Sequence, residues 1–435
     1  MKEIGKLLIK ELIIIAVCAF LGVAALAVTY LVSPDDIREN VRESAIILYN
    51  EGLGAQIWEG IKESQLDIYT DGLLFNVSYT STDDGLKDIL LDTRVKVGDT
   101  NPMNSLFEVI ALANDDYYVK NYARYWHGYQ IILRPLLLYF NYSDIRQLNM
   151  IFQLLLVFIL VYLLAVSEDR ALIIPFFGVY IALSPISLFS CLQYSPCFYI
   201  MMASLIALFA LKKYLNDTTR NYLFLLAGIL TAYFDLLTFP LITLAIPLIA
   251  YLGSNCVRLA ETKDRGLKDT IFYTVSWCIG YVGMWASKWI IAAILTGENA
   301  IEDAIERIKY RSGYSQDYTY FDVVKLNLSM YNAKVQTKVL LIVVICLAAY
   351  IIALVIKNYK NKKHITFDTK LLPNMGVILF VTIYPLIWYF FTTNHSNNHN
   401  YFTYKELAIS VFGILMIGLV SIKSIIVIPH KPQKM

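Results

Sequence analysis

The sequence predicts an all-α protein that crosses a membrane about ten times, with a large first loop outside the cytoplasm and a flat helix at the membrane surface. Of the 435 residues, 57% are hydrophobic and 17% are charged, and the mean hydropathy is +0.53. A soluble globule of this length is less apolar. Several runs also reach the roughly 20 apolar residues that are needed to cross the hydrocarbon core. The net charge of +2 indicates no basic face for nucleic acid, because the lysines fall in short loops.

The apolar runs divide the chain into an anchor, a loop and a bundle. The first run is too long for the core of a signal peptide and lacks a small-x-small cleavage site, so we expect it to be retained. The predicted spans are 12–32, 148–166, 171–190, 195–211, 222–234, 236–252, 271–295, 337–356, 374–391 and 406–428. The predicted parts are an anchor at 1–32, an extracytoplasmic loop at 33–147, and a bundle at 148–435 with outer loops at 296–336 and 392–405.

The basic residues predict the orientation. Lysines precede the first span, and with ten crossings every short basic loop falls on the same side as the N-terminus. Short cytoplasmic loops carry an excess of lysine and arginine. We therefore expect a multi-pass protein, of a bacterial plasma membrane, with both termini in the cytoplasm.

The segment 125–142 is apolar but does not fit a span. A guanidinium such as that of Arg134 costs at least ~2.5 kcal/mol at the centre of a lone membrane helix, and Pro135 follows it. One additional crossing here would also move each later basic loop outside. The sequence therefore predicts an interfacial helix, with its leucines and isoleucines against lipid or the bundle.

The outer loops contain helical patterns of their own. The first loop shows them near 36–50 and 103–123, and the sequence SPDD at 33–36 is typical of a helix start because its carboxylates suit the positive end of the helix dipole. The sequence AIEDAIERIKY at 300–310 spaces Ile301, Ile305 and Ile308 along one helical face.

Two stretches resemble a known family. The segment YWHGYQIILRPLLLYFNYSDIRQLNMIFQLLLVFILVYLLA is similar to the juxtamembrane helix, polar turn and long span of GT-C glycosyltransferases, although Trp126-His127-Gly128-Tyr129 departs from the family's double proline. The segment AGILTAYFDLLTFPLITLAIPLIAYL is similar to the family's hairpin of two short spans, with Asp235 and Pro240 at the turn. The resemblance implies an integral membrane enzyme that takes its sugar from a polyprenyl-phosphate donor and passes it to an extracytoplasmic glycan or lipid acceptor.

Such a transfer needs a carboxylate that deprotonates the acceptor hydroxyl. The resemblance places this acid in the first outer loop and favours Asp71 and Asp67, which share one face if helical. The pair Asp115 and Asp116, close in sequence to Arg124, is the second choice. The alternatives are a solvated face for Asp67 and Asp71, and a structural ion pair for Asp115 and Asp116.

Cations are needed to hold the departing lipid phosphate. Arg124 and Arg134 are candidates because a guanidinium grips phosphate with two parallel hydrogen bonds, and the alternative is that they snorkel to the interface. His127 is a candidate binding residue, with a hydrogen-bonded interfacial histidine as the alternative.

Four further polar residues in or beside the spans are candidate substrate contacts. Lys288 could face a phosphate or snorkel, and Asp235 could contact the acceptor or simply occupy an exposed turn. His395 and His399 are four residues apart but have no third acidic or thiolate ligand nearby, so we expect hydrogen bonds to sugar or phosphate and no metal.

The sequence leaves two other classes open. A polysaccharide polymerase or ligase also uses lipid-linked sugars, and a lipid or glycan transporter or flippase would have repeats with interrupted helices at the membrane midplane. No such pairing of spans occurs here, and no motif for an organic cofactor is present. Cys191 and Cys197 flank an outer turn, where a disulfide would form in an oxidising compartment.

Overall fold

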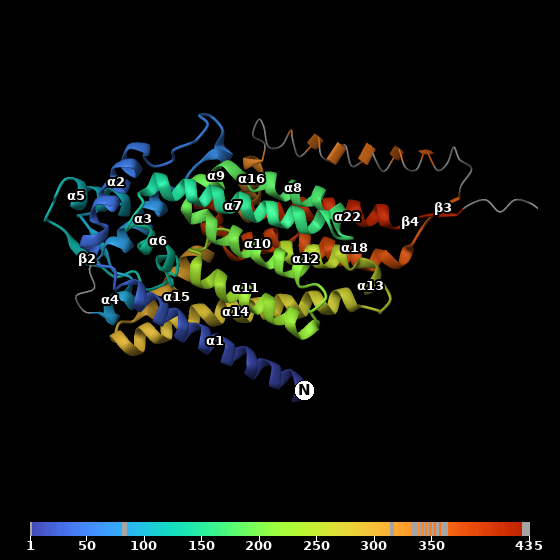
Figure 1. The fold of residues 1–435 in the computed structure, drawn as a ribbon, viewed down its shortest axis with the longest axis horizontal. Coiled ribbons are helices and arrows are strands. Elements are labelled where there is room, and N and C mark those ends of the chain that lie inside the picture. Colours follow the sequence, from blue (N-terminus) through green and yellow to red (C-terminus); the bar gives the residue numbers. More distant parts are fainter. Residues whose placement is uncertain are drawn as a thin grey trace, which may run out of the picture.

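The computed structural model describes residues 2–80, 85–313, 317–331 and 364–428, with isolated positions between 338 and 357. The chain is 77% helical and elongated, with two short two-stranded sheets. Figure 1 shows a bundle of long helices along the horizontal axis and a layer of shorter elements at its left end. We call these parts the bundle and the outer layer.

The bundle gives the chain the character of a membrane protein. Six segments of the described chain are long and apolar enough to cross a membrane: Gly5–Thr29, Tyr142–Ala165, Leu192–Ala210, Arg265–Thr296, Thr369–Phe391 and Asn400–Lys423. The shorter helices of the bundle lie between them. The bundle elements are α1 (Lys2–Thr29), α7 (Tyr142–Ala165), η2 (Arg170–Leu172), α8 (Ile173–Ala182), α9 (Pro185–Ser190), η3 (Leu192–Tyr194), α10 (Ser195–Ala210), α11 (Asp217–Phe234), α12 (Ile242–Ser254), α13 (Cys256–Ala260), α14 (Arg265–Thr296), η4 (Thr369–Leu371), α18 (Leu372–Thr382), α19 (Tyr384–Phe391) and α22 (Ala408–Lys423).

Two of the predicted spans are wrong in detail. The run 171–190 is not one helix, because α8 ends at Ala182 and Ser184, with φ of 56°, turns the chain before α9. The last run stops at Lys423, and β4 (Ile425–Ile428) instead pairs antiparallel with β3 (His364–Phe367). The predicted span 337–356 falls outside the described residues, apart from isolated positions.

The outer layer is built from the first loop and from segments between later spans. Its elements are α2 (Pro34–Glu51), η1 (Lys62–Ser64), α3 (Ile68–Tyr79), α4 (Leu86–Leu91), β1 (Arg94–Lys96), α5 (Pro102–Ala111), β2 (Tyr118–Lys120), α6 (Gln130–Leu136), α15 (Ala300–Ser312), α16 (Tyr320–Met330), α20 (Thr393–Asn398), α21 (Asn400–Thr403) and η5 (Tyr404–Leu407). The predicted helix start at 33–36 is confirmed, since Ser33 and Asp36 form a capping box on α2.

The helix predicted at 103–123 is too long. It ends at Ala111, and Ala113 adopts a left-handed φ of 54° that a helix cannot continue. The tyrosine- and valine-rich residues that follow form β2, which pairs antiparallel with β1. Competition from a partner strand therefore overrides the helical pattern.

The segment 125–142 contains a single short helix. With seven residues, α6 is too short to cross a membrane, in keeping with the prediction. Its environment differs from that of a helix lying on lipid, however, because Leu133, Arg134 and Leu137 are buried by protein. Only part of its surface, at Ile132 and Tyr139, is exposed.

The helix predicted at 300–310 is present as α15. Ile301, Ile305 and Ile308 are exposed, whereas the small Ala300 and Ala304 are buried. Small side chains allow α15 to lie close to its neighbour, α14.

The closest helix crossing of the bundle joins α11 and α14. A Cβ added at Gly228 would lie 2.2 Å from the carbonyl oxygen of Trp277, and one added at Gly280 would lie 2.3 Å from the carbonyl oxygen of Leu225. Because the backbones of α11 and α14 approach this closely, only glycine, whose side chain is a hydrogen atom, fits at both positions. The crossing brings the outer ends of both helices together beneath the outer layer.

We predict that Gly228→Ala destabilises the protein by ~1–3 kcal/mol, because the added methyl group must push the two helices apart. The measurement is the thermal unfolding midpoint of the purified protein in detergent. Gly376→Ala in α18 is the matched control, since its Cβ would meet nothing within 4 Å, and it should be neutral or slightly stabilising. Equal midpoints for Gly228→Ala and the wild type would show that the helices do not pack this closely.

Candidate functional site

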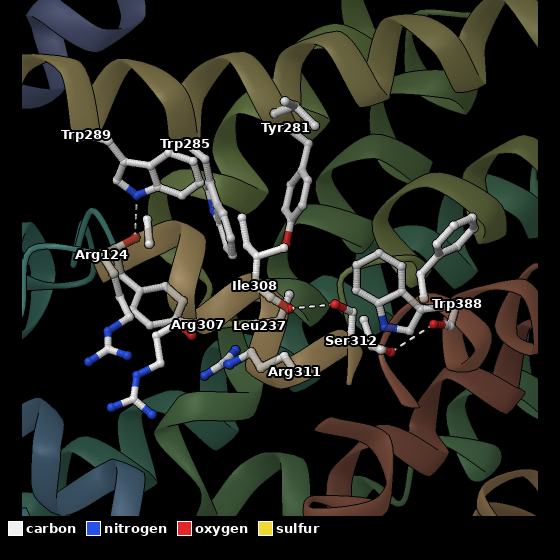
Figure 2. Close-up of a pocket in the computed structure, with 15 residues that line it drawn as sticks. Arg124, Leu237, Tyr281, Trp285, Trp289, Arg307, Ile308, Arg311, Ser312 and Trp388 are labelled. Carbon is white, nitrogen blue, oxygen red and sulfur yellow. Dashed lines mark hydrogen bonds between the residues drawn. The ribbon is translucent and has the colours of Figure 1, made fainter. Parts of the chain in front are cut away.

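A pocket of about 280 Å³ lies where the outer layer meets the bundle. Figure 2 shows its walls, with α14 supplying aromatic residues, α15 supplying arginines, and Trp388 at the end of α19 closing another side. The residues that we use below are Arg124, Leu237, Tyr281, Trp285, Trp289, Arg307, Ile308, Arg311 and Trp388. We call this cavity the arginine–tryptophan pocket.

Three arginines line the pocket, and their guanidinium groups lie toward the same side of it (Figure 2). The side chain of Arg124 is 14% exposed and lies 3.4 Å from a carboxylate oxygen of Asp303. Its guanidinium also stacks over the ring of Tyr122 at 4.6 Å. The Nε of Arg124 is the atom that faces Asp303, whereas the buried Nη1 of Arg311 has no hydrogen-bond partner. The pocket therefore holds positive charge with an unused donor.

The opposite wall is aromatic. Tyr281, Trp285 and Trp289 follow one another at four-residue spacing on α14, so their rings form a continuous stripe. Trp289 donates its indole N–H to the carbonyl of Arg124 at 2.9 Å, which ties the stripe to the outer layer. The indole nitrogens of Trp285 and Trp388 and the hydroxyl of Tyr281 are buried without a partner. These groups can donate to a ligand.

The turn between α11 and α12 forms another part of the wall. Asp235 is 2% exposed and accepts hydrogen bonds from the backbone N–H groups of Leu237 and Thr238. From the sequence, we expected Asp235 either to occupy an exposed turn or to contact the acceptor. The structure buries it as the residue that shapes the turn, which holds Leu237 at a φ of 69° on the pocket wall.

The two predicted histidines lie behind this turn. His395 Nε2 is 2.9 Å from the Leu237 carbonyl, and the ring of His399 lies 4.8 Å from that of His395 between centroids, tilted by 51°. Burial, together with Arg311 and His399, holds the pKa of His395 well below its usual value, so the ring is neutral. Its Nδ1 has no partner. His395 therefore supports the pocket wall and keeps one ring nitrogen free.

Asp67 keeps features of a general base. It caps α3 by accepting from the N–H of Thr70 at 3.1 Å, while its second oxygen is buried without a partner. Burial raises the pKa of Asp67 to about 7. Asp67 is not among the residues that line the arginine–tryptophan pocket.

Asp71 has a structural position. Its carboxylate accepts hydrogen bonds from the hydroxyl of Tyr142 at 2.5 Å and from the backbone N–H groups of Leu192 and Gln193 at 3.0 and 2.9 Å. It is fully buried. Both carboxylate oxygens already accept hydrogen bonds. Asp71 is therefore better suited to holding α3 against η3, just before α10, than to accepting a proton. Asp115 and Asp116 are exposed at the surface of the outer layer.

Arg134 and His127 are sealed inside the protein. The guanidinium of Arg134 donates to the carbonyl of Val32 at 2.7 and 3.0 Å and lies 4.2 Å from the ring centre of Tyr30. This geometry favours an anchor that fastens α6 to the end of α1, rather than the phosphate contact that we expected. His127 is also fully buried, and its Nδ1 lies 2.6 Å from the hydroxyl of Tyr129.

Lys288 neither snorkels nor faces the pocket. It is fully buried, and its ammonium group lies 2.5 Å from a carboxylate oxygen of Asp92, which is 1% exposed. Asp92 occupies a left-handed position, with φ of 47°, at the end of α4. The outer layer thus supplies the counter-ion for a lysine of the bundle.

A second cavity is a long apolar groove of about 780 Å³ among α6, α7, α10 and α11. Leucine, isoleucine and alanine side chains dominate its lining, with the aromatic rings of Tyr129, Phe152 and Phe234 among them. Asn149 and Ser195 contribute the few polar atoms. The groove has the size and character of a site for a hydrocarbon chain.

Cys191 and Cys197 are both free and buried, so the disulfide considered from the sequence is not formed. Cys197 Sγ lies 3.4 Å from the Thr238 hydroxyl instead. No group of three or more histidine, cysteine or acidic residues that could hold a metal ion occurs in the described part of the chain.

The sequence pattern missed Arg307 and Arg311 as pocket residues, and it also missed the partner of Lys288. Arg307 and Arg311 stand four residues apart on α15, which places them on the same face, but the predicted helix ended at 310, before Arg311. The spacing of Tyr281, Trp285 and Trp289 was a second available signal. By contrast, Asp92 lies 196 residues from Lys288, and no local pattern connects the two.

Comparisons with protein-family models, with curated proteins and with solved structures found no match to this chain.

We predict that Asp67→Asn becomes more stable relative to the wild type as the pH rises from about 4 to about 7. The folded-state pKa of about 7 lies above the unfolded value of about 3.9, so unfolding releases a proton in this window and stability falls with rising pH. Asparagine keeps the cap without the charge. The expected difference is ~2–4 kcal/mol at pH 7.5, measured by denaturant unfolding in detergent. Asp116→Asn at an exposed position is the control, and identical pH profiles for Asp67→Asn and the wild type would refute the raised pKa.

We also predict that Lys288→Met destabilises the protein by ~3–5 kcal/mol, because it leaves the Asp92 carboxylate buried without a counter-ion. The double variant Lys288→Met/Asp92→Leu should recover most of this loss, since both charges are then removed. Arg42→Gln, which breaks an exposed pair with Glu39, is the control and should leave stability nearly unchanged. Additive losses in the double variant would contradict the pairing.

Proposed function

We propose that the protein is a membrane glycosyltransferase that takes a sugar from a polyprenyl-phosphate donor and passes it to an acceptor outside the cytoplasm. The observation that carries the proposal is the arginine–tryptophan pocket. It combines three arginines, an aromatic stripe and several buried donors without partners, at the junction of the outer layer and the bundle. The GT-C resemblance of the sequence, described above, supports the same class.

The arginines suit the donor phosphate. Arg311 keeps a buried N–H group that is free for an acceptor. Arg307 and Arg124 add positive charge, with Arg124 beside Asp303. Guanidinium groups bind phosphate oxygens through paired hydrogen bonds. In the transfer, the bond between the anomeric carbon and the phosphate oxygen breaks, and the arginines stabilise the negative charge that remains on the lipid phosphate.

The aromatic wall suits a sugar. The indole rings of Trp285 and Trp388 can stack on the apolar faces of a pyranose, while their free N–H groups donate to its hydroxyls. The pocket volume of about 280 Å³ is near the lower end of the usual range for ligand sites, about 300–1,000 Å³. That volume matches a single sugar with its phosphate, and leaves the lipid chain outside.

The apolar groove suits the lipid chain. Its volume of about 780 Å³ and its hydrocarbon lining could hold several prenyl units. One stretch of chain contributes to both cavities, since Tyr125 lines the arginine–tryptophan pocket and Tyr129 lines the groove. The proposal therefore places the chain of the donor along α7 and α10 and its phosphate near the outer layer.

Asp67 is our choice for the base. Its free oxygen and its pKa of about 7 fit a group that takes the proton from the acceptor hydroxyl while that oxygen bonds to the anomeric carbon. Asp71 lacks a free oxygen. A pocket outside the cytoplasm is consistent with the basic loops at the opposite end of the bundle.

We predict that Arg311→Lys weakens the binding of polyprenyl phosphate about tenfold or more, because a lysine offers no second parallel hydrogen bond. The measurement is direct binding of radiolabelled polyprenyl phosphate to the protein in nanodiscs. Arg42→Lys, at an exposed site in the outer layer, is the control and should bind as the wild type does. Polyprenol, which has the chain without the phosphate, should bind much more weakly to every variant.

Two outcomes would overturn the proposal. Equal binding of polyprenol and polyprenyl phosphate would remove the role of the arginines. Absence of any polyprenyl-phosphate sugar among the lipids that accumulate in cells lacking the protein would remove the donor. A transporter or flippase would instead move the lipid-linked sugar between leaflets of sealed vesicles without releasing the sugar from its phosphate.

A further inference from the structure

The end of the bundle away from the outer layer has a second polar cavity. It measures about 260 Å³ and lies among the end of α10, the start of α11, the end of α12 and α13. Its polar lining consists of Lys212, Arg220, Tyr251, Ser254, Asn255 and Arg258. The lining contains three cations and no acidic residue. We call this cavity the basic pocket.

Arg220 is the buried cation of the basic pocket. It is 8% exposed, and its guanidinium lies 5.2 Å from the ring centre of Tyr251. One nitrogen, Nη2, donates to Asp217 at 3.0 Å, but the buried Nε has no hydrogen-bond partner. A buried N–H group without an acceptor destabilises the folded protein, unless a ligand or a water molecule accepts a hydrogen bond from it. This atom is the independent indication of a ligand.

Arg258 and Lys212 are the other two cations of the basic pocket. Arg258 is exposed and donates to the Tyr251 hydroxyl at 3.2 Å, and no ion pair of Arg258 is found among the described residues. Lys212 pairs with Asp169 at 2.6 Å, and its ammonium group also reaches the hydroxyl of Ser254. The hydroxyl groups of Ser254 and Tyr251 donate to Asp169 and Asp269. The donors that remain for a phosphate group are therefore the guanidinium of Arg258 and the buried Nε of Arg220.

The position of the basic pocket favours a lipid as its ligand. Its remaining walls are Leu208, Phe209 and Leu215, at the end of an apolar helix of the bundle. Leu211 and Tyr214 beside it are exposed. A phosphate bound to the arginines would therefore have apolar side chains next to it, where the acyl chains of a phospholipid could lie.

We propose that the basic pocket binds the headgroup of an anionic phospholipid in the membrane leaflet at this end of the bundle. Basic pockets between membrane helices recognise such headgroups. The site is distinct from the arginine–tryptophan pocket, because α11 separates the two with 18 residues, about 27 Å at the usual helical rise. The lipid would hold the end of α10, the start of α11 and the end of α12 together. Its phosphate would accept a hydrogen bond from the unpartnered Nε of Arg220.

The test is lipid binding to the purified protein, followed by native mass spectrometry. Dioleoyl phosphatidylglycerol and dioleoyl phosphatidylcholine are titrated separately, so that the acyl chains are identical. We expect phosphatidylglycerol to bind more tightly, and Arg258→Gln to weaken that binding roughly fivefold, the size of effect expected for one cation near a lipid surface. Arg258 is exposed, so its replacement leaves the packing of the bundle unchanged.

Arg170→Gln is the matched control, because Arg170 is exposed at the same end of the bundle and does not line the basic pocket. It should leave phosphatidylglycerol binding unchanged. Equal affinity for the two lipids, or equal losses for Arg258→Gln and Arg170→Gln, would overturn the proposal. Displacement of the lipid by millimolar inorganic phosphate alone would also overturn it, because the site would then recognise a free anion.

Discussion

Two charged groups that are buried where the outer layer meets the bundle find their partners across that boundary, and the packing of the two parts depends on these contacts. An unpaired charge in such a place would cost several kcal/mol. The ammonium group of Lys288 in the bundle meets Asp92 of the outer layer, and the carboxylate of Asp71 in the outer layer meets two backbone N–H groups at the start of α10. These contacts make the two parts one unit.

The arginine–tryptophan pocket follows from this junction. Neither part forms it alone, since α14 supplies the aromatic stripe while Arg124 and α15 supply the cations. The hydrogen bond from Trp289 to the carbonyl of Arg124 holds the two walls together. The same junction explains why several charged residues that attract attention in the sequence, such as Arg134, serve to fasten segments rather than to bind a ligand.

Local sequence patterns were sufficient to predict single helices but not the contacts between distant segments. Ser33 and the acidic residues after it marked the start of α2 correctly, and six of the ten predicted spans coincide with segments that are long and apolar enough to cross a membrane. The end of α5 at Ala111 was missed because strand pairing competes there with the helix, and a pairing partner is not visible in a local pattern. The roles of Asp71 and Lys288 were missed for a similar reason, since their partners are distant in sequence. Asp67 and Asp71 are both buried and differ in the hydrogen bonds of their carboxylates, which likewise depend on the whole fold.

Hydrogen exchange tests most directly whether the outer layer and the bundle are one unit. Amides of α3 in the outer layer and of α12 in the bundle would be compared in the purified protein by mass spectrometry, since exchange reports the free energy of local opening. The account predicts slow exchange of similar rate for both helices, because both are buried and α3 is held by Asp71. Rapid exchange of α3 while α12 stays protected would contradict it, because the outer layer would then open without the bundle.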